Sequence, residues 1–377
     1  MDFELSEEQA ALAGTARDLL ARRWSPERMR AALDAPPASI EPELWSELAA
    51  LGWIGIATAE DAGGSGADVV TAAVLVEEAG RALLPGPFLS TLAAAAALDR
   101  SGDDRARKTL LADLVAGSLH VTLALEEPGI GWGPDRVGLR AEEEGDGWRL
   151  DGVKVLVPDA EVADVVLVAA TGDDRGVQLL AVPTGAPGLT ITPMRRLDAQ
   201  SVSELAFDGV RVSTDALVGE PAASGRAVAE AYDIWTLLGA ADLLGVTERV
   251  LEITTEYARQ RTQFGRAIGS FQAVSHRLAD GLVDVEIGRS LVYGAGLALT
   301  EASRRAPALV SAAKAWMSDA AVRVAETAVQ VHGGIGYTWE LDVHLYLRRA
   351  RAGAVTLGDA DHHRDRVATE LERETED

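Results

Sequence analysis

The sequence has 377 residues, of which 47% are hydrophobic and 25% charged, a balance typical of a globular protein with a large core. The formal net charge of −24 argues against nucleic acid or an anionic membrane surface as a partner. The absence of cysteine excludes disulfides, thiolate catalysis and cysteine-based zinc sites. No secretory signal or membrane-length apolar run is present, so we expect a soluble, cytoplasmic protein.

The first third of the chain predicts helices. Ser6 is a candidate N-cap for an amphipathic helix, and PELWSELAALGWIGI at 42–56 predicts a second helix that ends at Gly52. The acid- and glycine-rich stretch at 59–68 reads as a loop, and the alanine-rich segments that follow add further helices. We expect an N-terminal α-helical domain over residues 1–118.

The middle third changes to short β-branched runs separated by turn residues. These runs predict a β-barrel or sandwich domain over residues 119–219. The Asp151-Gly152 pair lies between two such runs and predicts a hairpin turn there.

The last third returns to helical periodicity, and residues 220–377 predict an antiparallel four-helix bundle. The four long periodic segments cover residues 223–260, 270–303, 306–332 and 342–374. The fold class is therefore α+β, in the order helical domain, β-domain and helical bundle.

Two segments between the bundle helices are candidates for ligand binding. The first, RQRTQFGRAIGSFQ at 259–272, reads either as a plain interhelical turn or as a site where Arg261 meets a phosphate and Phe264 and Phe271 flank a base. The second, QVHGGIGYTWE at 330–340, reads either as a glycine C-cap or as a backbone that a phosphate can approach closely.

Taken together, the motifs resemble the acyl-CoA dehydrogenase flavoprotein family. The resemblance rests on the α–β–α layout and on five motifs in the same order. These are ALEEPGIG at 124–131, WRLDGVKVLVPDAEVADVVLVA at 148–169, RTQFG at 261–265, FQAVSHRLAD at 271–280 and QVHGGIGYT at 330–338. The resemblance covers essentially the whole chain.

The resemblance implies removal of the α- and β-hydrogens of an acyl-CoA thioester, with a carboxylate taking the α-proton and FAD taking a hydride. It also implies an electron-acceptor flavoprotein and a homo- or hetero-oligomer, dimer or tetramer, in which one subunit supplies much of the ADP-binding surface for its neighbour's FAD. The residues that would serve the partner's FAD are Arg261, Gln263, Phe264, Phe271, Gln272, Gln330, Gly333, Gly334 and Gly336.

Both positions that hold the catalytic carboxylate in this family are occupied by other residues. By alignment Leu357, before Gly358, stands at the usual glutamate position, and Trp235 stands at the alternative one on the first bundle helix. The remaining nearby carboxylates are those of Asp233, Asp242, Asp359 and Asp361. The catalytic base is therefore unassigned.

The segment TLGDADHHRD at 356–365 also raises the question of a metal site. Adjacent histidines on a helix point about 100° apart, so His362 and His363 do not converge on one ion. We expect DHHRD to be a solvated helix face, apart from any FAD contact from Asp359 or Asp361, with no metal bound.

The β-domain departs from the family pattern as well. Leu156 stands at an aromatic position, Pro158 at a position for a hydroxyl that bonds near the flavin N5, and Trp132 where a small hydroxyl residue meets the FAD phosphate. Proline has neither an N–H nor a hydroxyl to offer. The residues that serve a neighbour's flavin in this family are thus present, whereas those that hold the chain's own flavin are replaced by other residue types.

This asymmetry resembles bacterial members of the family, of the actinobacterial sterol-degradation type, that assemble from two different subunits. The leading hypothesis is a subunit for FAD-dependent dehydrogenation of acyl-CoA thioesters that acts with a catalytic partner chain. The alternatives are a self-sufficient homo-oligomeric dehydrogenase with an unusual base such as Asp359 or Asp242, and a flavin-free structural or acyl-CoA-binding paralogue. The acyl chain and the CoA contacts stay unassigned.

Overall fold

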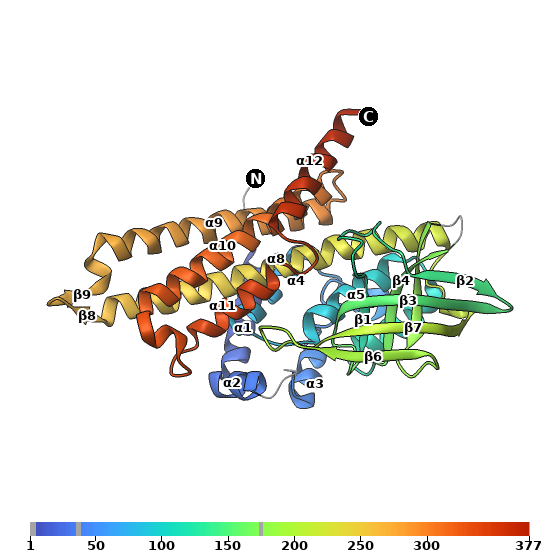
Figure 1. The fold of residues 1–377 in the computed structure, drawn as a ribbon, viewed down its shortest axis with the longest axis horizontal. Helices are drawn as coiled ribbons and strands as arrows, with labels where there is room; N and C mark the ends of the chain where they lie inside the picture. Colours follow the sequence, from blue (N-terminus) through green and yellow to red (C-terminus); the bar gives the residue numbers. More distant parts are fainter. Residues whose placement is uncertain (1–4, 35–38, 173–175, 377) are drawn as a thin grey trace. The chain divides into compact units, whose positions relative to one another are not determined.

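The computed structural model describes residues 5–34, 39–172 and 176–376. Two compact units account for the chain, and each is described by itself. The helical unit comprises Met1–Pro26, Ala73–Leu84 and Thr236–Asp377, and the β-containing unit comprises Glu27–Ala72 and Pro85–Trp235. Helices precede the strands and further helices follow them, so the predicted α+β class is confirmed (Figure 1).

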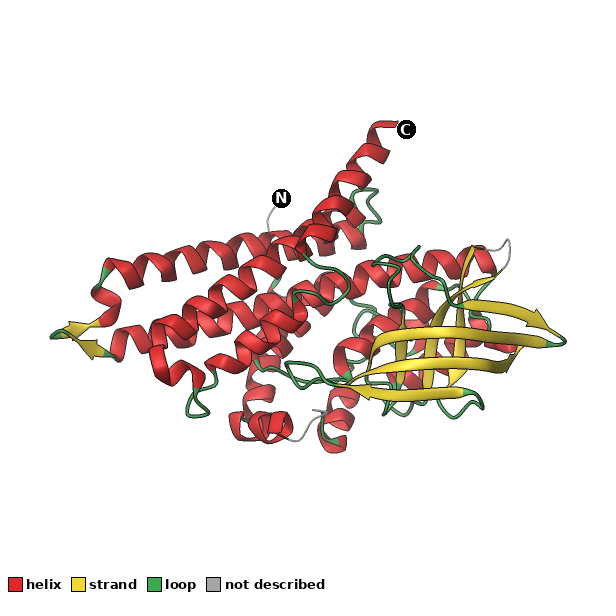
Figure 2. Cartoon of the chain, viewed as in Figure 1, coloured by secondary structure: helices red, strands yellow, loops and turns green. Residues whose placement is uncertain are grey.

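The β-containing unit places short helices ahead of a single large sheet, whose strands are yellow in Figure 2. The helices and helical turns are α2 Pro26–Asp34, α3 Pro42–Ala50, η1 Glu60–Ala62, α5 Phe88–Arg100, α6 Asp104–Ala106, η2 Arg107–Leu111, α7 Ala112–Val115 and η3 Thr214–Ala216. The strands are β1 Val121–Ala124, β2 Arg140–Glu144, β3 Gly147–Pro158, β4 Val165–Gly172, β5 Gly176–Pro183, β6 Leu189–Met194 and β7 Val202–Ser213.

The described strands form one sheet in the order β1-β4-β2-β3-β7-β6, with β5 paired to β4. β1 runs parallel to β4, whereas β3–β7, β6–β7 and β4–β5 are antiparallel. The buried side chains of these strands, such as Leu150, Val166, Leu180 and Leu205, form the core of this unit. Each buried leucine or valine contributes about 1.5–3 kcal/mol relative to an exposed one.

The predicted hairpin turn at Asp151-Gly152 is wrong. β3 runs straight through this pair, and the turn lies at Gly145 and Asp146, between β2 and β3. Gly152, with φ of 146°, lies where the β3–β7 register shifts, so the pair forms a β-bulge. The Asp151 carboxylate accepts a hydrogen bond from the Gly209 N–H at 2.9 Å, a long-range contact that the local signal does not contain.

The helical unit is built mainly from long helices. Its elements are α1 Glu7–Arg23, α8 Pro221–Gln260, β8 Thr262–Gln263, β9 Arg266–Ala267, η4 Ile268–Ser270, α9 Gln272–Thr300, α10 Ala306–His332, η5 Gly333–Tyr337, α11 Val343–Gly353 and α12 Ala360–Glu376. The first residues of α4, Val69–Arg81, and of α8 belong to the β-containing unit. The predicted N-cap of α1 is confirmed, because the Ser6 hydroxyl accepts the Gln9 N–H and the Gln9 side chain accepts the Ser6 N–H.

Helices α4 and α8 approach each other closely within this unit. A Cβ added to Gly80 would lie 2.2 Å from the Asp242 carbonyl oxygen, and one added to Gly245 would lie 1.9 Å from that of Glu77. Only glycine fits at these two positions. The close contact places the middle of α8 firmly in the core of the unit.

The fourth predicted bundle helix is not continuous. Residues 354–359 interrupt the segment 342–374 and separate α11 from α12. Leu357 and Gly358 have φ values of 59° and 112°, which a right-handed helix cannot contain. Within the described part of the chain, no helix combines the length and apolar character needed to cross a membrane.

Candidate functional site

A two-stranded hairpin follows the end of α8. Thr262 pairs with Ala267 and Gln263 with Arg266, so Phe264 and Gly265 form a two-residue turn. Both turn residues have positive φ, 52° and 77°, as a type I′ turn requires. The turn places the Phe264 side chain at the tip of the hairpin, where it is 92% exposed.

The side chains around this turn form a small aromatic and cationic cluster. The rings of Phe264 and Phe271 meet edge to face with centroids 6.1 Å apart, and the Arg266 guanidinium carbon lies 4.0 Å from the centroid of Phe271. These contacts orient the exposed Phe264 ring without covering it. Arg266 was not among the predicted site residues, although its place directly after the turn glycine was a usable signal.

The hairpin is also a basic region in an acidic protein. Between Tyr257 and Ala279 the sequence contains four arginines and no acidic residue, whereas the chain as a whole carries a net charge of −24. Arg261, Gln263 and Gln272 are exposed. No side chain of the described residues pairs with the guanidinium of Arg261, so this group is available to an anion.

The second predicted segment begins where α10 ends. Gly333 has φ of 66°, and its N–H is donated to the carbonyl oxygens of Gln330 and Val329, so it serves as the C-cap of the helix. The glycine C-cap reading is therefore correct for Gly333. Gly336 is instead buried, and a Cβ added there would lie 2.9 Å from the Val329 carbonyl oxygen.

Part of the backbone of the same segment is open to solvent. A Cβ added to Gly333 or Gly334 would meet no atom within 4 Å, and both residues are exposed, as is Gln330 one turn earlier. The backbone at this point can therefore be approached by a ligand group, which a side chain would prevent.

The two segments lie at the same end of the helical unit (Figure 1). The rings of Tyr257 in α8 and His332 in α10 stack with centroids 4.2 Å apart, next to the hairpin on one side and the glycines on the other. Burial lowers the pKa of His332, and its Nδ1 donates to the Ala328 carbonyl oxygen at 2.8 Å. The pair is thus a neutral, packed link between the two halves of the candidate site.

The loop that carries Leu357 is held in place by a buried lysine of α10. The ammonium group of Lys314, a buried residue of α10, donates to the carbonyl oxygens of Gly353, Ala354 and Gly358 at 3.1, 3.2 and 3.1 Å. Leu357 itself is 2% exposed. The backbone of this loop is well defined, but its central side chain cannot transfer a proton.

The segment DHHRD is only partly a solvated face. Asp361, Arg364 and Asp365 are exposed as expected, but His363 is fully buried. Its Nε2 donates to the Leu357 carbonyl oxygen at 3.1 Å. Burial and the charge of Lys314 lower the pKa of His363 to about 2, so the ring is neutral. The expectation for His363 was wrong because this side of α12 packs against α10.

The other carboxylates near the expected base positions have structural partners. Arg349 donates to both carboxylate oxygens of Asp242, at 2.9 and 2.8 Å. Asp359 accepts the His362 N–H at 2.9 Å and caps α12, and Asp361 pairs with Arg364. In the β-containing unit, Asp233 and Trp235 are both buried in the first part of α8.

The β-domain positions that depart from the family pattern are also defined. Leu156 lies at an irregularity of β3 with φ of 53°, and Pro158 ends the strand opposite Val202. Nearby, the fully buried Lys154 donates to the Glu127 carboxylate at 2.6 Å. Burial lowers the pKa of Lys154 to about 8. This ion pair supports the strand, but it offers no hydroxyl where Pro158 stands.

Known proteins are similar to this chain over nearly its whole length. The sequence matches the acyl-CoA dehydrogenase N-terminal domain over residues 6–118, the middle domain over 122–210 and the C-terminal domain over 235–372. The chain is 35% identical to the acyl-CoA dehydrogenase FadE27 of Mycobacterium tuberculosis, with 98% of this chain and 99% of the relative covered.

Solved structures are similar over the same length. A chain of the ChsE4–ChsE5 complex from Mycobacterium tuberculosis matches with a TM-score of 0.91 and 34% identity, covering 98% of this chain and 99% of that one. A variant of the Tcur3481–Tcur3483 steroid ACAD matches with a TM-score of 0.89, 34% identity and the same coverage.

Proposed function

Because the chain belongs to the acyl-CoA dehydrogenase family, we propose that it is a subunit for FAD-dependent α,β-dehydrogenation of acyl-CoA thioesters that acts with a catalytic partner chain. In this proposal the end of the helical unit forms the ADP half of a flavin site shared with the partner. One contrast carries the proposal: Arg261 and Phe264 are exposed, whereas the buried Leu357 stands at the expected base position.

The residues at the bundle end fit the ADP half of FAD. Arg261 offers a free guanidinium to a phosphate, and the backbone at Gly333 and Gly334 is open to close approach. Phe264 presents an uncovered ring, and Phe271, Gln263, Gln272 and Gln330 complete the set, whereas the buried Gly336 packs against α10 behind them. When bound, the flavin ring supplies the acceptor for the hydride that leaves the substrate β-carbon. This chain would bind and orient the distal part of the cofactor.

The partner chain would supply the proton-accepting carboxylate. A base must reach hydrogen-bond distance of the α-proton. In this chain the Leu357 side chain cannot act, Asp242 is committed to Arg349, and Asp359 caps α12. These contacts argue against the self-sufficient enzyme with an aspartate base. The similar ChsE4–ChsE5 structure is a complex, which supports a two-chain assembly.

The substrate class is an acyl-CoA thioester, and the steroid ACAD among the similar structures supports a bulky acyl group. An electron-acceptor flavoprotein would reoxidise the flavin, and the assembly would work in the cytoplasm.

The first test is a calorimetric titration of the purified protein with FAD and with ADP. The second is the visible absorption spectrum of the protein, expressed alone and coexpressed with a dehydrogenase-like chain that is encoded beside it. We expect no retained flavin in the lone protein, weak ADP binding, and flavin bands in the coexpressed complex. Arg261→Gln should weaken ADP binding about tenfold or more, since a charge-assisted bond contributes about 1.5–3 kcal/mol.

Arg140→Gln is the matched control, because Arg140 is another exposed arginine, on β2 of the other unit. Flavin retained by the lone protein and bleached by an acyl-CoA would contradict the half-site proposal and point to a self-sufficient enzyme. A complex that stays colourless would instead identify the flavin-free paralogue.

A further inference from the structure

A pocket of about 710 Å³ lies in the β-containing unit, between the end of α3, the turn η1 and the helical segment formed by α6, η2 and α7. Its volume falls in the range of about 300–1,000 Å³ that is typical of small-molecule sites. The apolar part of its lining consists of small residues, among them Ala49, Ala62, Ala112, Val115 and Ala116. None of the predicted cofactor residues lines this pocket, so it is separate from the candidate site.

The one accessible lysine side chain of the protein lies at this pocket. Only three of the 35 lysine and arginine residues are lysines. Lys154 and Lys314 are 0% and 1% exposed, whereas Lys108 is exposed and lines the pocket. No side chain of the described residues pairs with the ammonium group of Lys108. This group is therefore free to bind a carboxylate.

A free carboxylate lines the pocket one helical turn earlier. Asp104 is exposed, and its side chain also has no partner among the described residues. An acid and a lysine four residues apart on a regular α-helix commonly form an ion pair. Here the segment changes to π-helix at Arg107, so Lys108 lies on a wider turn than Asp104, and no ion pair joins the two. Short π-helical turns are frequent at functional sites.

The other charges of the pocket are already compensated. Arg107 donates to the two carboxylate oxygens of Asp61 at 3.2 and 2.5 Å, and to the carboxylate of Asp99 at 3.3 Å. A simple anion would be repelled by the net charge of −24 and by these acids, and a simple cation would be repelled by Lys108. A zwitterion has no net charge and matches both free groups.

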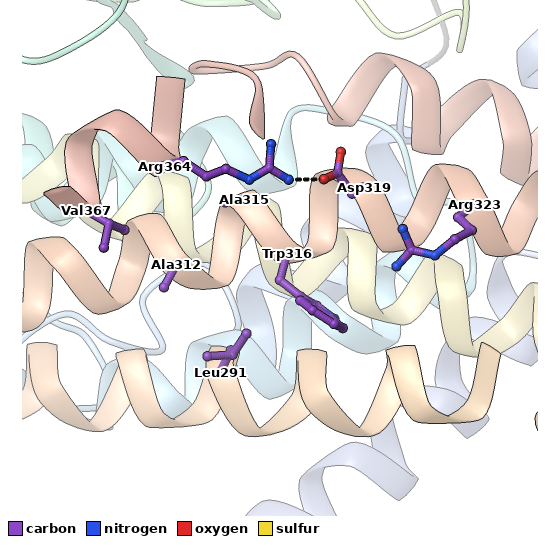
Figure 3. Close-up of a pocket in the computed structure, with 8 residues that line it drawn as sticks. All are labelled: Leu291, Ala312, Ala315, Trp316, Asp319, Arg323, Arg364 and Val367. Atoms are coloured by element: carbon purple, nitrogen blue, oxygen red, sulfur yellow. Dashed lines mark hydrogen bonds and ion pairs between the residues drawn. The ribbon is translucent and has the colours of Figure 1, made fainter. Parts of the chain in front are cut away.

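A second groove, of about 400 Å³ between α9, α10 and α12 of the helical unit, differs in this respect (Figure 3). Its charged lining residues are Asp319, Arg323 and Arg364. Arg364 pairs with Asp319, and Arg323 pairs with Asp284. That groove offers a ligand no free charge, whereas the pocket beside η2 offers two of opposite sign.

We propose that the pocket beside η2 binds the zwitterion of a small apolar α-amino acid. The Lys108 ammonium pairs with the carboxylate of the ligand, and the Asp104 carboxylate pairs with its ammonium group. The two protein groups lie about one helical turn apart, a separation that a molecule with adjacent charged groups can bridge. The apolar side chain of the ligand packs against the alanines and Val115. Binding requires neither FAD nor the catalytic partner, so it is a property beyond the proposed dehydrogenation.

Calorimetric titration of the purified full-length protein tests which parts of the ligand are recognised. The probes are L-leucine, isocaproate, which lacks the ammonium group, and isoamylamine, which lacks the carboxylate. We expect leucine to bind with one site per chain. Each analogue should bind about tenfold more weakly or worse, because it leaves one charged group of the pocket without a partner.

Two variants test whether the binding occurs in this pocket. Lys108→Met and Asp104→Asn should each weaken leucine binding about tenfold or more. The matched controls are Arg140→Gln and Asp113→Asn, which alter exposed residues outside the pocket and should leave binding unchanged. All four side chains are exposed, so none of the variants should lower the thermal midpoint appreciably.

The scarcity of lysine allows an independent measurement. An amine-selective acetylating reagent should modify Lys108 alone among the lysines of the folded protein, and peptide mass spectrometry measures its rate. Leucine should slow this reaction, and isoamylamine should not. The proposal would be overturned if leucine gave neither binding heat nor protection, or if its binding survived both pocket variants. Isocaproate that binds as tightly as leucine would also overturn it, because the pocket would then recognise a carboxylate alone.

Discussion

The guanidinium of Arg349 in α11 forms two parallel hydrogen bonds with the carboxylate of Asp242 in α8, at 2.9 and 2.8 Å, and both side chains are buried. Arg349 also donates to the Leu84 carbonyl oxygen at 3.4 Å. A buried, bidentate ion pair is a structural connection, and it occupies both oxygens of the carboxylate. Because its carboxylate is bound to Arg349, Asp242 is not available as a base.

Breaking this pair should destabilise the helical unit. Asp242→Ala leaves the Arg349 charge buried without its partner, and we expect the free energy of unfolding to fall by about 3–5 kcal/mol. Urea denaturation followed by circular dichroism measures the loss. The double variant Asp242→Leu with Arg349→Met should recover most of it. If a fully folded Asp242→Asn protein loses the dehydrogenase activity of the coexpressed complex, Asp242 has a catalytic role instead.

Lys314 should control the order of the loop at 354–359. Lys314→Met removes the donor shared by the carbonyl oxygens of Gly353, Ala354 and Gly358, and each buried group left without a partner costs about 1–3 kcal/mol. We expect faster amide exchange in residues 353–363 by hydrogen–deuterium mass spectrometry. Lys108→Met, which alters an exposed lysine, is the control. Unchanged exchange in the loop would show that other contacts hold it.

Phe264 should be a residue kept for binding rather than for stability. Its ring is 92% exposed and its φ is 52°, a conformation that costs a non-glycine residue about 1–2 kcal/mol and that asparagine tolerates better. Phe264→Asn also creates the Asn-Gly pair favoured in type I′ turns. We expect this variant to be as stable as the parent or about 1 kcal/mol more stable, with weaker ADP or FAD binding. A loss of stability in thermal unfolding would mean that the ring has a packing role.

Lys154 should make the stability of the protein depend on pH in the alkaline range. Burial lowers its pKa from 10.5 to about 8 despite the attraction of Glu127. Between these two values the unfolded chain binds more protons at this residue than the folded chain, so stability should rise as the pH increases from about 8 to about 10. The total effect is at most about 3 kcal/mol.

Other groups titrate in the same range, so the comparison is with a Lys154→Met variant. Urea midpoints of both proteins at several pH values between about 7.5 and 10 isolate the Lys154 contribution. A difference between the two curves that does not change with pH would show that Glu127 holds the lysine in its charged form throughout.

Some features of the site could be read from the sequence because they are local. The motifs around Arg261 and Gln330 identify the segments at the two helix ends, and Leu357, Trp235 and Pro158 show by residue type alone what they cannot do in catalysis. The capping box at Ser6 is equally local, since its two hydrogen bonds join residues three positions apart. The arginine-rich composition of the hairpin segment needs no structure to be seen.

The sequence by itself determined the α–β–α order and the family, because residue type and spacing decide these, and it predicts the loss of the usual base. Only the tertiary structure decided that Asp151-Gly152 is a bulge, that α11 and α12 are separate helices, that His363 is buried, and that Asp242 is paired. Each of these depends on contacts between residues far apart in the chain, such as Asp151 with Gly209 and Lys314 with Gly358. Local propensity is a weak preference of a fraction of a kcal/mol per residue, and long-range packing and buried hydrogen bonds override it.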